Sequence, residues 1–152
     1  MNLISKELLE FNKLLDNEPN PKDVKVNEEY GNKYLPLRKV EELLKTIYGA
    51  VQYVKSGNIM IVGNNAVYSL DVVVFHPVLK EWLTYNGVSS VPITVDKEGK
   101  AINLHSHLPM AKAFAITNAA RYIGRAFGSH LNEDDSIVVE KGKAAGLLNN
   151  LK

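Results

Sequence analysis

The feature that most constrains the fold is a block of β-forming residues between about positions 51 and 95. Two apolar runs, NIMIVG (58 to 63) and AVYSLDVVVFH (66 to 76), meet at the stretch GNN, which is a tight-turn signal. The chain turns again at HPVLKE and continues as WLTYNGVSSVPITV, where Pro92 indicates an edge, bulge or bend. DKEGK is a further turn. The block therefore predicts three to four antiparallel strands.

Two amphipathic helices are expected before this block. Residues 3 to 15 carry a broad apolar stripe, which the proline-containing stretch DNEPNPKD interrupts. The run KYLPLRKVEELLKTIYG predicts a second helix at about 36 to 48, with Pro36 in its first turn and Gly49 as its stop. The first helix is expected to be an appendage that packs on the domain or on a neighbouring subunit. We accordingly divide the chain into an N-terminal helix and linker (1–22), a core domain (23–132) and a C-terminal tail (133–152).

An alanine-rich helix is expected after the β block, from about 108 to 127. At about 100° per residue its apolar side chains gather on one side, which would pack on the sheet. The polar side chains gather on the other side: Thr117, Asn118, Arg121 and Arg125. The two guanidinium groups are expected to point the same way and to suit successive phosphates or a carboxylate-lined partner, with Asn118 as a neutral donor. Gly124 inside this helix indicates that another group approaches closely.

The element order is helix, helix, β-meander, long helix. It predicts an α+β fold in which helices cover one face of an antiparallel sheet. The net charge is only +1, with 18 Lys and Arg against 17 Asp and Glu, so a polyanion would need a local basic cluster. The absence of cysteine excludes disulfides and thiolate metal sites. The N-terminal stretch has no apolar signal region, and no window approaches the roughly 18 apolar residues of a membrane span. We therefore expect a cytoplasmic protein with no membrane partner.

The stretch TNAARYIGRAFGSHLN resembles the signature helix of the single-strand annealing recombination proteins, which include the eukaryotic Rad fifty-two-like and the phage Sak-like and Erf-like annealing proteins. That helix has the form T-[D/N]-small-x-[K/R]-x-x-x-R-x-F-G, which this sequence meets from Thr117 to Gly128 with no gap. KYLPLRKVEELLKTIYG is similar to the family's other landmark, a helix opened by a Tyr and ended by an aromatic-Gly pair, here Tyr34 and Tyr48-Gly49. The meander between them also agrees, so the resemblance covers roughly residues 30 to 132.

The resemblance implies a β-β-β-α core, assembly of subunits into rings or helical filaments, and a groove beside the long helix. In that groove single-stranded DNA lies with its backbone inward and its bases outward. Arg121 and Arg125 fall on the family's basic positions, and Lys39 falls on another near the start of the earlier helix. The sequence departs from the eukaryotic branch at Tyr122, where that branch has a second basic residue. Tyr122 is expected nearer the packing face, which argues against stacking on bases.

Lys33, Arg38 and Lys39 form the one basic cluster in the earlier part of the chain. We expect this cluster to reach the edge of the groove and to assist the two arginines.

The expected function is binding of single-stranded DNA and annealing of complementary strands in recombination or repair, by a homo-oligomer of phage or mobile-element type. A phage exonuclease or a single-strand binding protein is a further expected partner. Phosphate contacts alone give sequence-independent, salt-sensitive binding. Annealing needs no general acid, metal or nucleotide, and the chain has no G-x-x-x-x-G-K-[ST] loop. We therefore expect no cofactor and no enzymatic turnover.

Two alternatives to annealing stay open. The chain could bind single-stranded DNA without annealing it, or it could be a structural oligomer whose arginines pair with acidic groups across subunits. Two arginines on one helix face are also an ordinary solvated surface.

Three other groups of residues suggest sites, and each has a plainer interpretation. His105 and His107 could join His76 or His130 at a metal, although surface positions are the default for such histidines. The acidic run 133 to 135 could join Asp71 in a nuclease site, although Asp71 is expected to face solvent. The strand aromatics could stack on bases or, more commonly, pack across strands: Tyr53, Tyr68, Trp82 and Tyr85.

Overall fold

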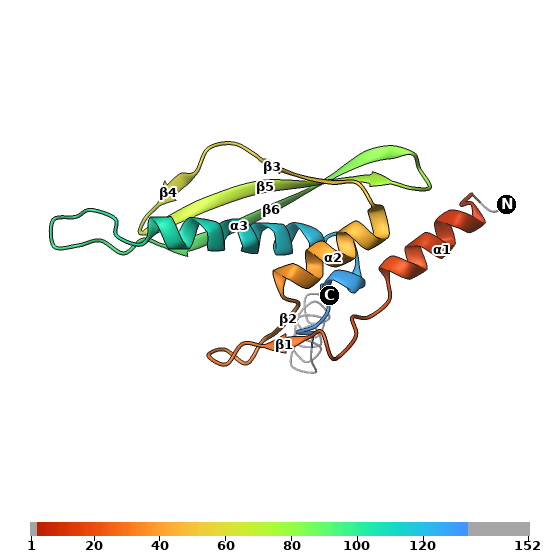
Figure 1. The fold of residues 1–152 in the computed structure, drawn as a ribbon, viewed down its shortest axis with the longest axis horizontal. Helices are drawn as coiled ribbons and strands as arrows, with labels where there is room; N and C mark the ends of the chain where they lie inside the picture. The colour runs from red at the N-terminus through yellow and green to blue at the C-terminus, as the bar shows by residue number, and fades with distance from the viewer. Residues whose placement is uncertain (1–2, 134–152) are drawn as a thin grey trace, which may run out of the picture.

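The structure is a computed structural model that describes residues 3–133 (Figure 1). The expected α+β class is confirmed: an antiparallel meander packs against a long helix, and two helices precede it. The elements follow in the order α1 (Lys6–Leu15), β1 (Lys25–Val26), β2 (Lys33–Tyr34), α2 (Leu37–Tyr48), β3 (Val51–Lys55), β4 (Met60–Val62), β5 (Asn65–His76), β6 (Glu81–Pro92), α3 (Leu104–Arg121) and the short 3-10 helix η1 (Arg125–Phe127).

The main sheet is built around β5. On one side β6 pairs with β5 along its whole length, from Asn65 opposite Pro92 to His76 opposite Glu81. On the other side β3 and β4 pair with successive parts of β5. Residues 56–59 of this edge lie opposite only residues 68 and 69, because Lys55 pairs with Leu70 and Met60 pairs with Val67. β3 and β4 are therefore one strand interrupted by a bulge, and the sheet is three strands wide.

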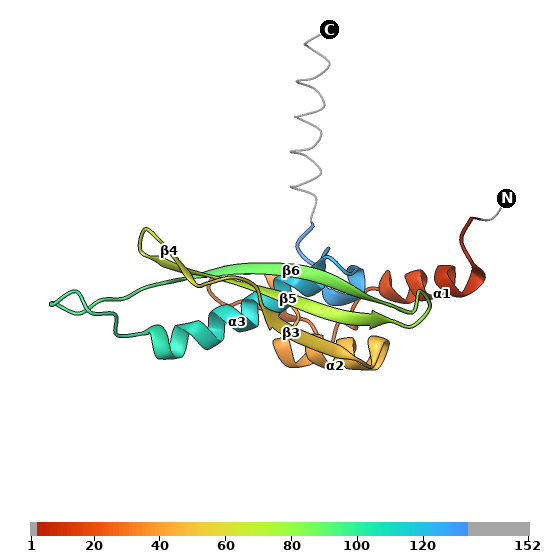
Figure 2. The same ribbon diagram turned by 90° about the horizontal axis from the view of Figure 1, so that it is seen from above.

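One face of the sheet carries the core. Alternation along β5 turns Leu70, Val72 and Val74 toward α3, and all three are buried. α2 adds Val40, Leu44 and Tyr48 to the same cluster. Figure 2 shows α3 lying along the sheet, with α2 beside the C-terminal half of α3. The opposite face of the sheet has no covering element in the described part of the chain.

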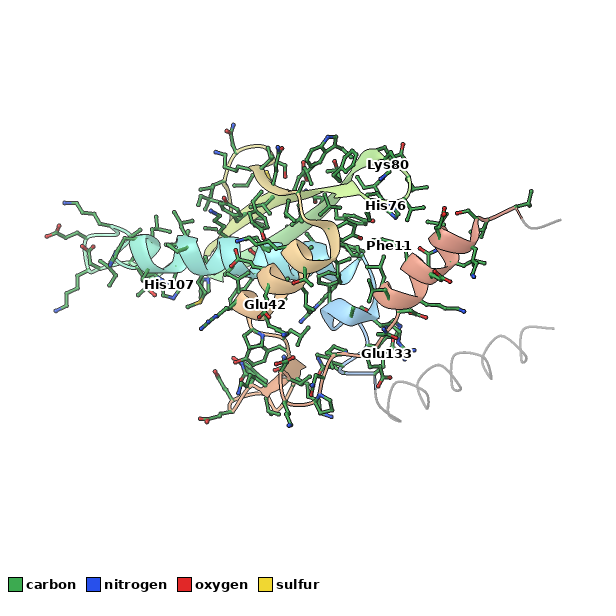
Figure 3. All side chains as sticks on the ribbon, turned by 45° about the vertical axis from the view of Figure 1, so that its right-hand side comes forward. Phe11, Glu42, His76, Lys80, His107 and Glu133 are labelled. Carbon is green, nitrogen blue, oxygen red and sulfur yellow. The ribbon has the colours of Figure 1, made fainter. Side chains whose placement is uncertain are left out.

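α1 packs on the domain of its own chain, which is one of the two expected arrangements. Ser5 caps the helix by accepting a hydrogen bond from the Leu8 amide at 3.2 Å. Phe11 and Leu15 belong to the main core. The Phe11 ring lies 4.5 Å from the ring of His76 at the end of β5, centroid to centroid (Figure 3). Of the expected tail, residues 134–152 lie outside the described residues.

The backbone of α3 rests directly on β6 at Gly87. A Cβ at this position would overlap the carbonyl oxygen of Ala115 and lie 2.7 Å from the nitrogen of Ala119. Two hydrogen bonds join the same elements on the adjoining residues. Asn118 Nδ2 donates to the Val88 carbonyl at 2.8 Å, and the Ser89 hydroxyl donates to the Ala111 carbonyl. At Gly87 the helix is therefore held against the strand with no side chain between the two backbones.

We predict that Gly87→Ala destabilises the protein by about 3 kcal/mol, the upper end of overpacking costs, because backbone atoms of a helix cannot step aside as a flexible side chain can. Chemical denaturation measures this change. Ser90→Thr is the control, because it enlarges a residue of β6 that is exposed. It should change the free energy of unfolding by under about 0.5 kcal/mol. A Gly87→Ala variant as stable as Ser90→Thr would contradict the contact.

His76 is buried at the end of β5 and acts as an acceptor. Its Nδ1 accepts hydrogen bonds from the amides of Val78 and Leu79 at 3.2 and 3.1 Å. Burial lowers the pKa of His76 below its ordinary value, an effect that the Glu81 carboxylate opposes. The neutral ring is therefore the form that the fold favours.

Because the folded-state pKa of His76 is lowered, the unfolded chain binds the proton more readily. The contribution of His76 is then fully present above about pH 6.5 and is lost as the pH falls through the folded-state pKa. We predict that the Tm of the wild type falls more between pH 7.5 and pH 5 than the Tm of His76→Asn, whose amide oxygen can accept without titrating. The exposed His105→Asn should keep the wild-type slope. Equal slopes in all three proteins would overturn the assignment.

Candidate nucleic-acid interface

The long helix ends earlier than the sequence predicts. The expected span of 108 to 127 is wrong at both ends, because α3 runs from Leu104 to Arg121. The helix is interrupted at Gly124, whose backbone is extended. A Cβ at this position would lie 2.5 Å from the carbonyl oxygen of Leu15. The close approach expected at Gly124 is thus confirmed, and the approaching group is the C-terminal end of α1.

The break separates the two arginines. Arg121 is the last residue of α3, whereas Arg125 begins η1. The expectation that both guanidinium groups share one helix face is therefore wrong, and the two side chains line different cavities.

The first cavity, which we call the Arg121 groove, has a volume of about 500 Å³, which lies in the range typical of ligand sites. Its walls are the β1–β2 hairpin, the start of α2, one side of α3 and the later part of β6. The lining residues are Asn27, Asn32, Tyr34, Leu35, Leu37, Ser89, Ser90, Ala113, Phe114, Thr117, Asn118 and Arg121.

Several polar side chains of the Arg121 groove are engaged in holding its walls. Asn118 Nδ2 donates to the β6 edge at Val88, and the Thr117 hydroxyl donates to the Ala113 carbonyl at 3.0 Å. Asn27 Oδ1 accepts from two amides of the β1–β2 turn. Arg121 differs, because within residues 3–133 it makes no ion pair. It is also the one charged side chain among the residues that line the groove.

The other predicted basic residues are not brought to this groove. Lys39 is 3.3 Å from the Asp23 carboxylate and 3.5 Å from that of Glu42, and the hydrogen bond with Asp23 raises the pKa of Lys39. Lys33 lines the second cavity together with Arg125. Arg38 is exposed on α2 and lines neither cavity. The sequence cluster therefore does not form a single basic surface with Arg121.

Two aromatic residues near Arg121 were missed or misplaced by sequence reasoning. Phe114 lines the groove with 49% of its surface exposed. Its spacing of three and seven residues from Thr117 and Arg121 places it on their side of α3, so helical periodicity could have found it. Tyr122 is 76% exposed rather than near the packing face. The prediction that Tyr122 lies nearer the packing face, which argued against stacking on bases, is thus wrong.

The histidines and acidic residues do not gather. His76 lies in the core at one end of the sheet and His107 at the opposite end of the molecule (Figure 3). Among residues 3–133, no three His, Cys, Asp or Glu side chains are placed to hold one metal ion. Asp71 lies on the outer face of the sheet, as expected, and accepts a hydrogen bond from Asn86 Nδ2 at 2.8 Å. Of the acidic run 133 to 135 that could join Asp71, Asp134 and Asp135 lie outside the described residues.

The strand aromatics do not make one platform. Tyr53, Tyr68 and Tyr85 pack against the main core. Trp82 lies on the other face, where it contacts Phe75 edge to face at a centroid distance of 5.4 Å. Phe75 and Trp82 are directly opposite in the β5–β6 register, so this pair is ordinary cross-strand packing.

No protein-family model and no curated protein matches this chain. In the part of the chain that the structure describes, no helix combines the length and the apolar character needed to cross a membrane.

We predict that Gly124→Ala loosens α1 from the domain, because the added Cβ meets the rigid carbonyl of Leu15. The expected loss of stability is about 1 to 3 kcal/mol, and hydrogen exchange should become faster in Lys6–Leu15. Tyr122→Ala, at an exposed position two residues away, should leave that exchange unchanged. A Gly124→Ala variant that is more stable than the wild type would contradict the contact, because only the higher helix propensity of alanine would then affect stability.

Proposed function

We propose that this chain binds single-stranded DNA in the Arg121 groove and promotes annealing of complementary strands as a homo-oligomer. One observation carries the proposal. Tyr34 of the first family-like motif and Thr117, Asn118 and Arg121 of the second line the same groove. The two motifs are far apart in the sequence, and the fold brings them to one surface. A resemblance without functional meaning would not require this meeting.

The chemistry of the groove suits a strand held by its backbone. The Arg121 guanidinium has no counter-ion among the described residues, so a phosphate can take its planar fork of donors. Nearby side chains are mostly apolar or already hydrogen-bonded, and they offer few groups for reading base edges. Binding would then be independent of sequence, and bases that face outward stay free to pair with a second strand.

A single groove offers little charge, which is the reason for including assembly in the proposal. One phosphate contact to a single strand contributes a salt slope of only about 0.7. Several copies along one strand, in a ring or a helical filament, sum these contacts through effective concentration. The homo-oligomer is therefore proposed as the form that binds.

The proposed activity is stoichiometric, without enzymatic turnover. We place it in recombination or repair of a phage or mobile element, in the cytoplasm, with an exonuclease or a single-strand binding protein as a further partner. These assignments follow from the resemblance of the motifs.

We predict that Arg121→Gln weakens binding of a labelled 40-mer of thymidine by about tenfold or more and reduces the salt dependence of the binding constant. Fluorescence anisotropy at two salt concentrations measures both changes. Arg38→Gln is the matched control, because it removes the same charge from a residue outside both cavities. Light scattering should give both variants the mass of the wild type.

The outcomes separate the alternatives. Equal losses in Arg121→Gln and Arg38→Gln would indicate a diffuse charge effect instead of a groove. If Arg121→Gln changes the mass, the arginine holds subunits together, as in the structural alternative. If the wild type binds but does not speed pairing of two complementary labelled strands, the protein is a binding module without annealing activity. No binding at low salt would limit the resemblance to the fold.

A further inference from the structure

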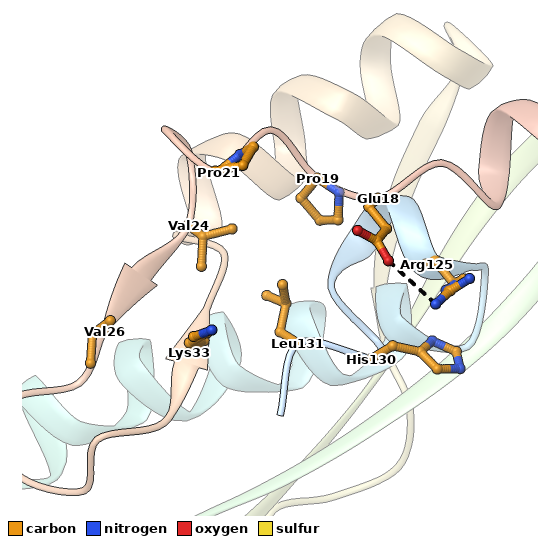
Figure 4. Close-up of a pocket in the computed structure, with 9 residues that line it drawn as sticks. All are labelled: Glu18, Pro19, Pro21, Val24, Val26, Lys33, Arg125, His130 and Leu131. Atoms are coloured by element: carbon orange, nitrogen blue, oxygen red, sulfur yellow. Dashed lines mark hydrogen bonds and ion pairs between the residues drawn. The ribbon is translucent and has the colours of Figure 1, made fainter. Parts of the chain in front are cut away.

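A second cavity, the Arg125 pocket, lies on the other side of β2 from the Arg121 groove. Neighbouring residues of β2 point to opposite sides, so Lys33 lines the pocket and Tyr34 lines the groove. The pocket has a volume of about 420 Å³. Figure 4 shows its lining residues, which come from the linker after α1, the β1–β2 hairpin, η1 and the segment after η1: Glu18, Pro19, Pro21, Val24, Val26, Lys33, Arg125, His130 and Leu131.

The walls of the pocket are fixed by hydrogen bonds and packing. Asn132 clips the segment after η1 to β2, since its side chain accepts from the Lys33 amide at 2.7 Å and donates to the Lys33 carbonyl at 2.8 Å. On the other wall, the contact between Gly124 and Leu15 fixes the backbone position from which the Arg125 side chain extends. The pocket is thus formed before any ligand enters it.

Positive side chains outnumber negative ones in the lining. Lys33 and Arg125 carry permanent charge, and Glu18 is the one carboxylate among the lining residues. His130 is the third basic group, and its Nε2 is 3.8 Å from the carboxylate of Glu133, which is not among the lining residues. The lining therefore favours an anion.

Arg125 is held loosely for an arginine in a cavity. Within residues 3–133, its one ion pair joins a terminal nitrogen to Glu18 at 3.4 Å, and the Glu18 side chain is 79% exposed. Its Nε is buried and has no acceptor within residues 3–133. A guanidinium has five N–H donors in a planar fork, so most of them are unused here. A phosphate that displaced Glu18 would give the fork a bidentate partner.

The rest of the lining is apolar and suits more than a bare ion. Two prolines, two valines and a leucine form this part: Pro19, Pro21, Val24, Val26 and Leu131. A small ion would leave this surface in contact with water. A ligand with a flat ring beside its phosphate would cover it, which is a favourable burial of apolar area.

We propose that the Arg125 pocket binds a phosphate monoester that carries a planar ring, such as a nucleoside monophosphate, and that Glu18 competes with the phosphate for Arg125. Arg125 takes the phosphate, Lys33 adds charge, and the prolines with Leu131 contact the ring. The site goes beyond the proposed function, because it uses a different cavity and does not involve Arg121.

Isothermal titration calorimetry with deoxyadenosine monophosphate tests the site. The wild type and Arg121→Gln should bind alike, Glu18→Gln should bind severalfold more tightly, and Arg125→Gln should lose binding by tenfold or more. Lys33→Gln should weaken binding to a smaller extent and serves if Arg125→Gln fails to fold. Deoxyadenosine and inorganic phosphate should each bind at least tenfold more weakly than the nucleotide.

Other results would overturn the proposal. It is wrong if neither the wild type nor Glu18→Gln binds the nucleotide, or if Arg125→Gln binds as well as the wild type. It is also wrong if Glu18→Gln weakens binding, since the carboxylate would then be a structural clamp. If deoxyadenosine binds as tightly as the nucleotide, the phosphate contact is excluded. If inorganic phosphate binds as tightly as the nucleotide, the ring contact is excluded.

The phosphate could belong to a free nucleotide or to the 5′ end of a strand. Competition in the Arg121→Gln background distinguishes these sources, because strand binding in the groove is weakened there. Displacement of the nucleotide by a short 5′-phosphorylated thymidine oligomer, but not by its unphosphorylated form, assigns the pocket to a strand end. No displacement assigns it to the free nucleotide. A failure of thymidine 40-mer binding in the wild type would bear on the groove alone.

Discussion

The contact between the α3 backbone and Gly87 is the constraint on which the rest of the structure depends. It fixes the height of α3 over β6, and the adjoining hydrogen bonds of Asn118 and Ser89 fix its rotation and position along the strand. One side of α3 is thereby buried through alanines, and the side that carries Phe114, Thr117 and Arg121 faces the β1–β2 hairpin. The groove is a consequence of this close packing, since a bulkier residue at the contact would lift the helix from its place.

A second close contact decides how the basic residues are shared between cavities. The backbone is extended at Gly124, where the end of α1 approaches closely, and Arg125 turns away from Arg121. The helix that was expected to be an appendage thus packs against the signature motif. The lack of a Cβ at Gly124 allows this close approach, because a larger residue would overlap a backbone carbonyl.

The sequence predicts the local part of this fold well and the long-range part poorly. The β block, its turns and the span of α2 follow from alternation and from Pro36 and Gly49, which act within a few residues. The end of α3 does not, because the group that packs against the break at Gly124 is Leu15, from the other end of the chain. The ion pairs of Lys39 with Asp23 and of Arg125 with Glu18 are missed for the same reason. The sequence predicts Arg121 as a site residue. Its position in one groove with Tyr34 could be seen only in the folded structure.

Internal pairing also explains how a chain of net charge +1 could still hold a polyanion. Within the described residues, Lys39 and Arg125 are balanced by acidic partners of their own chain, whereas Arg121 faces its groove without one. Local charge, not total charge, then decides where a phosphate can bind. In the proposed function, a protomer with one such arginine would gain affinity for a strand chiefly because several copies bind along it. The proposed need for an oligomer therefore follows from the modest charge of each groove. Binding through many weak backbone contacts would leave each base accessible for pairing.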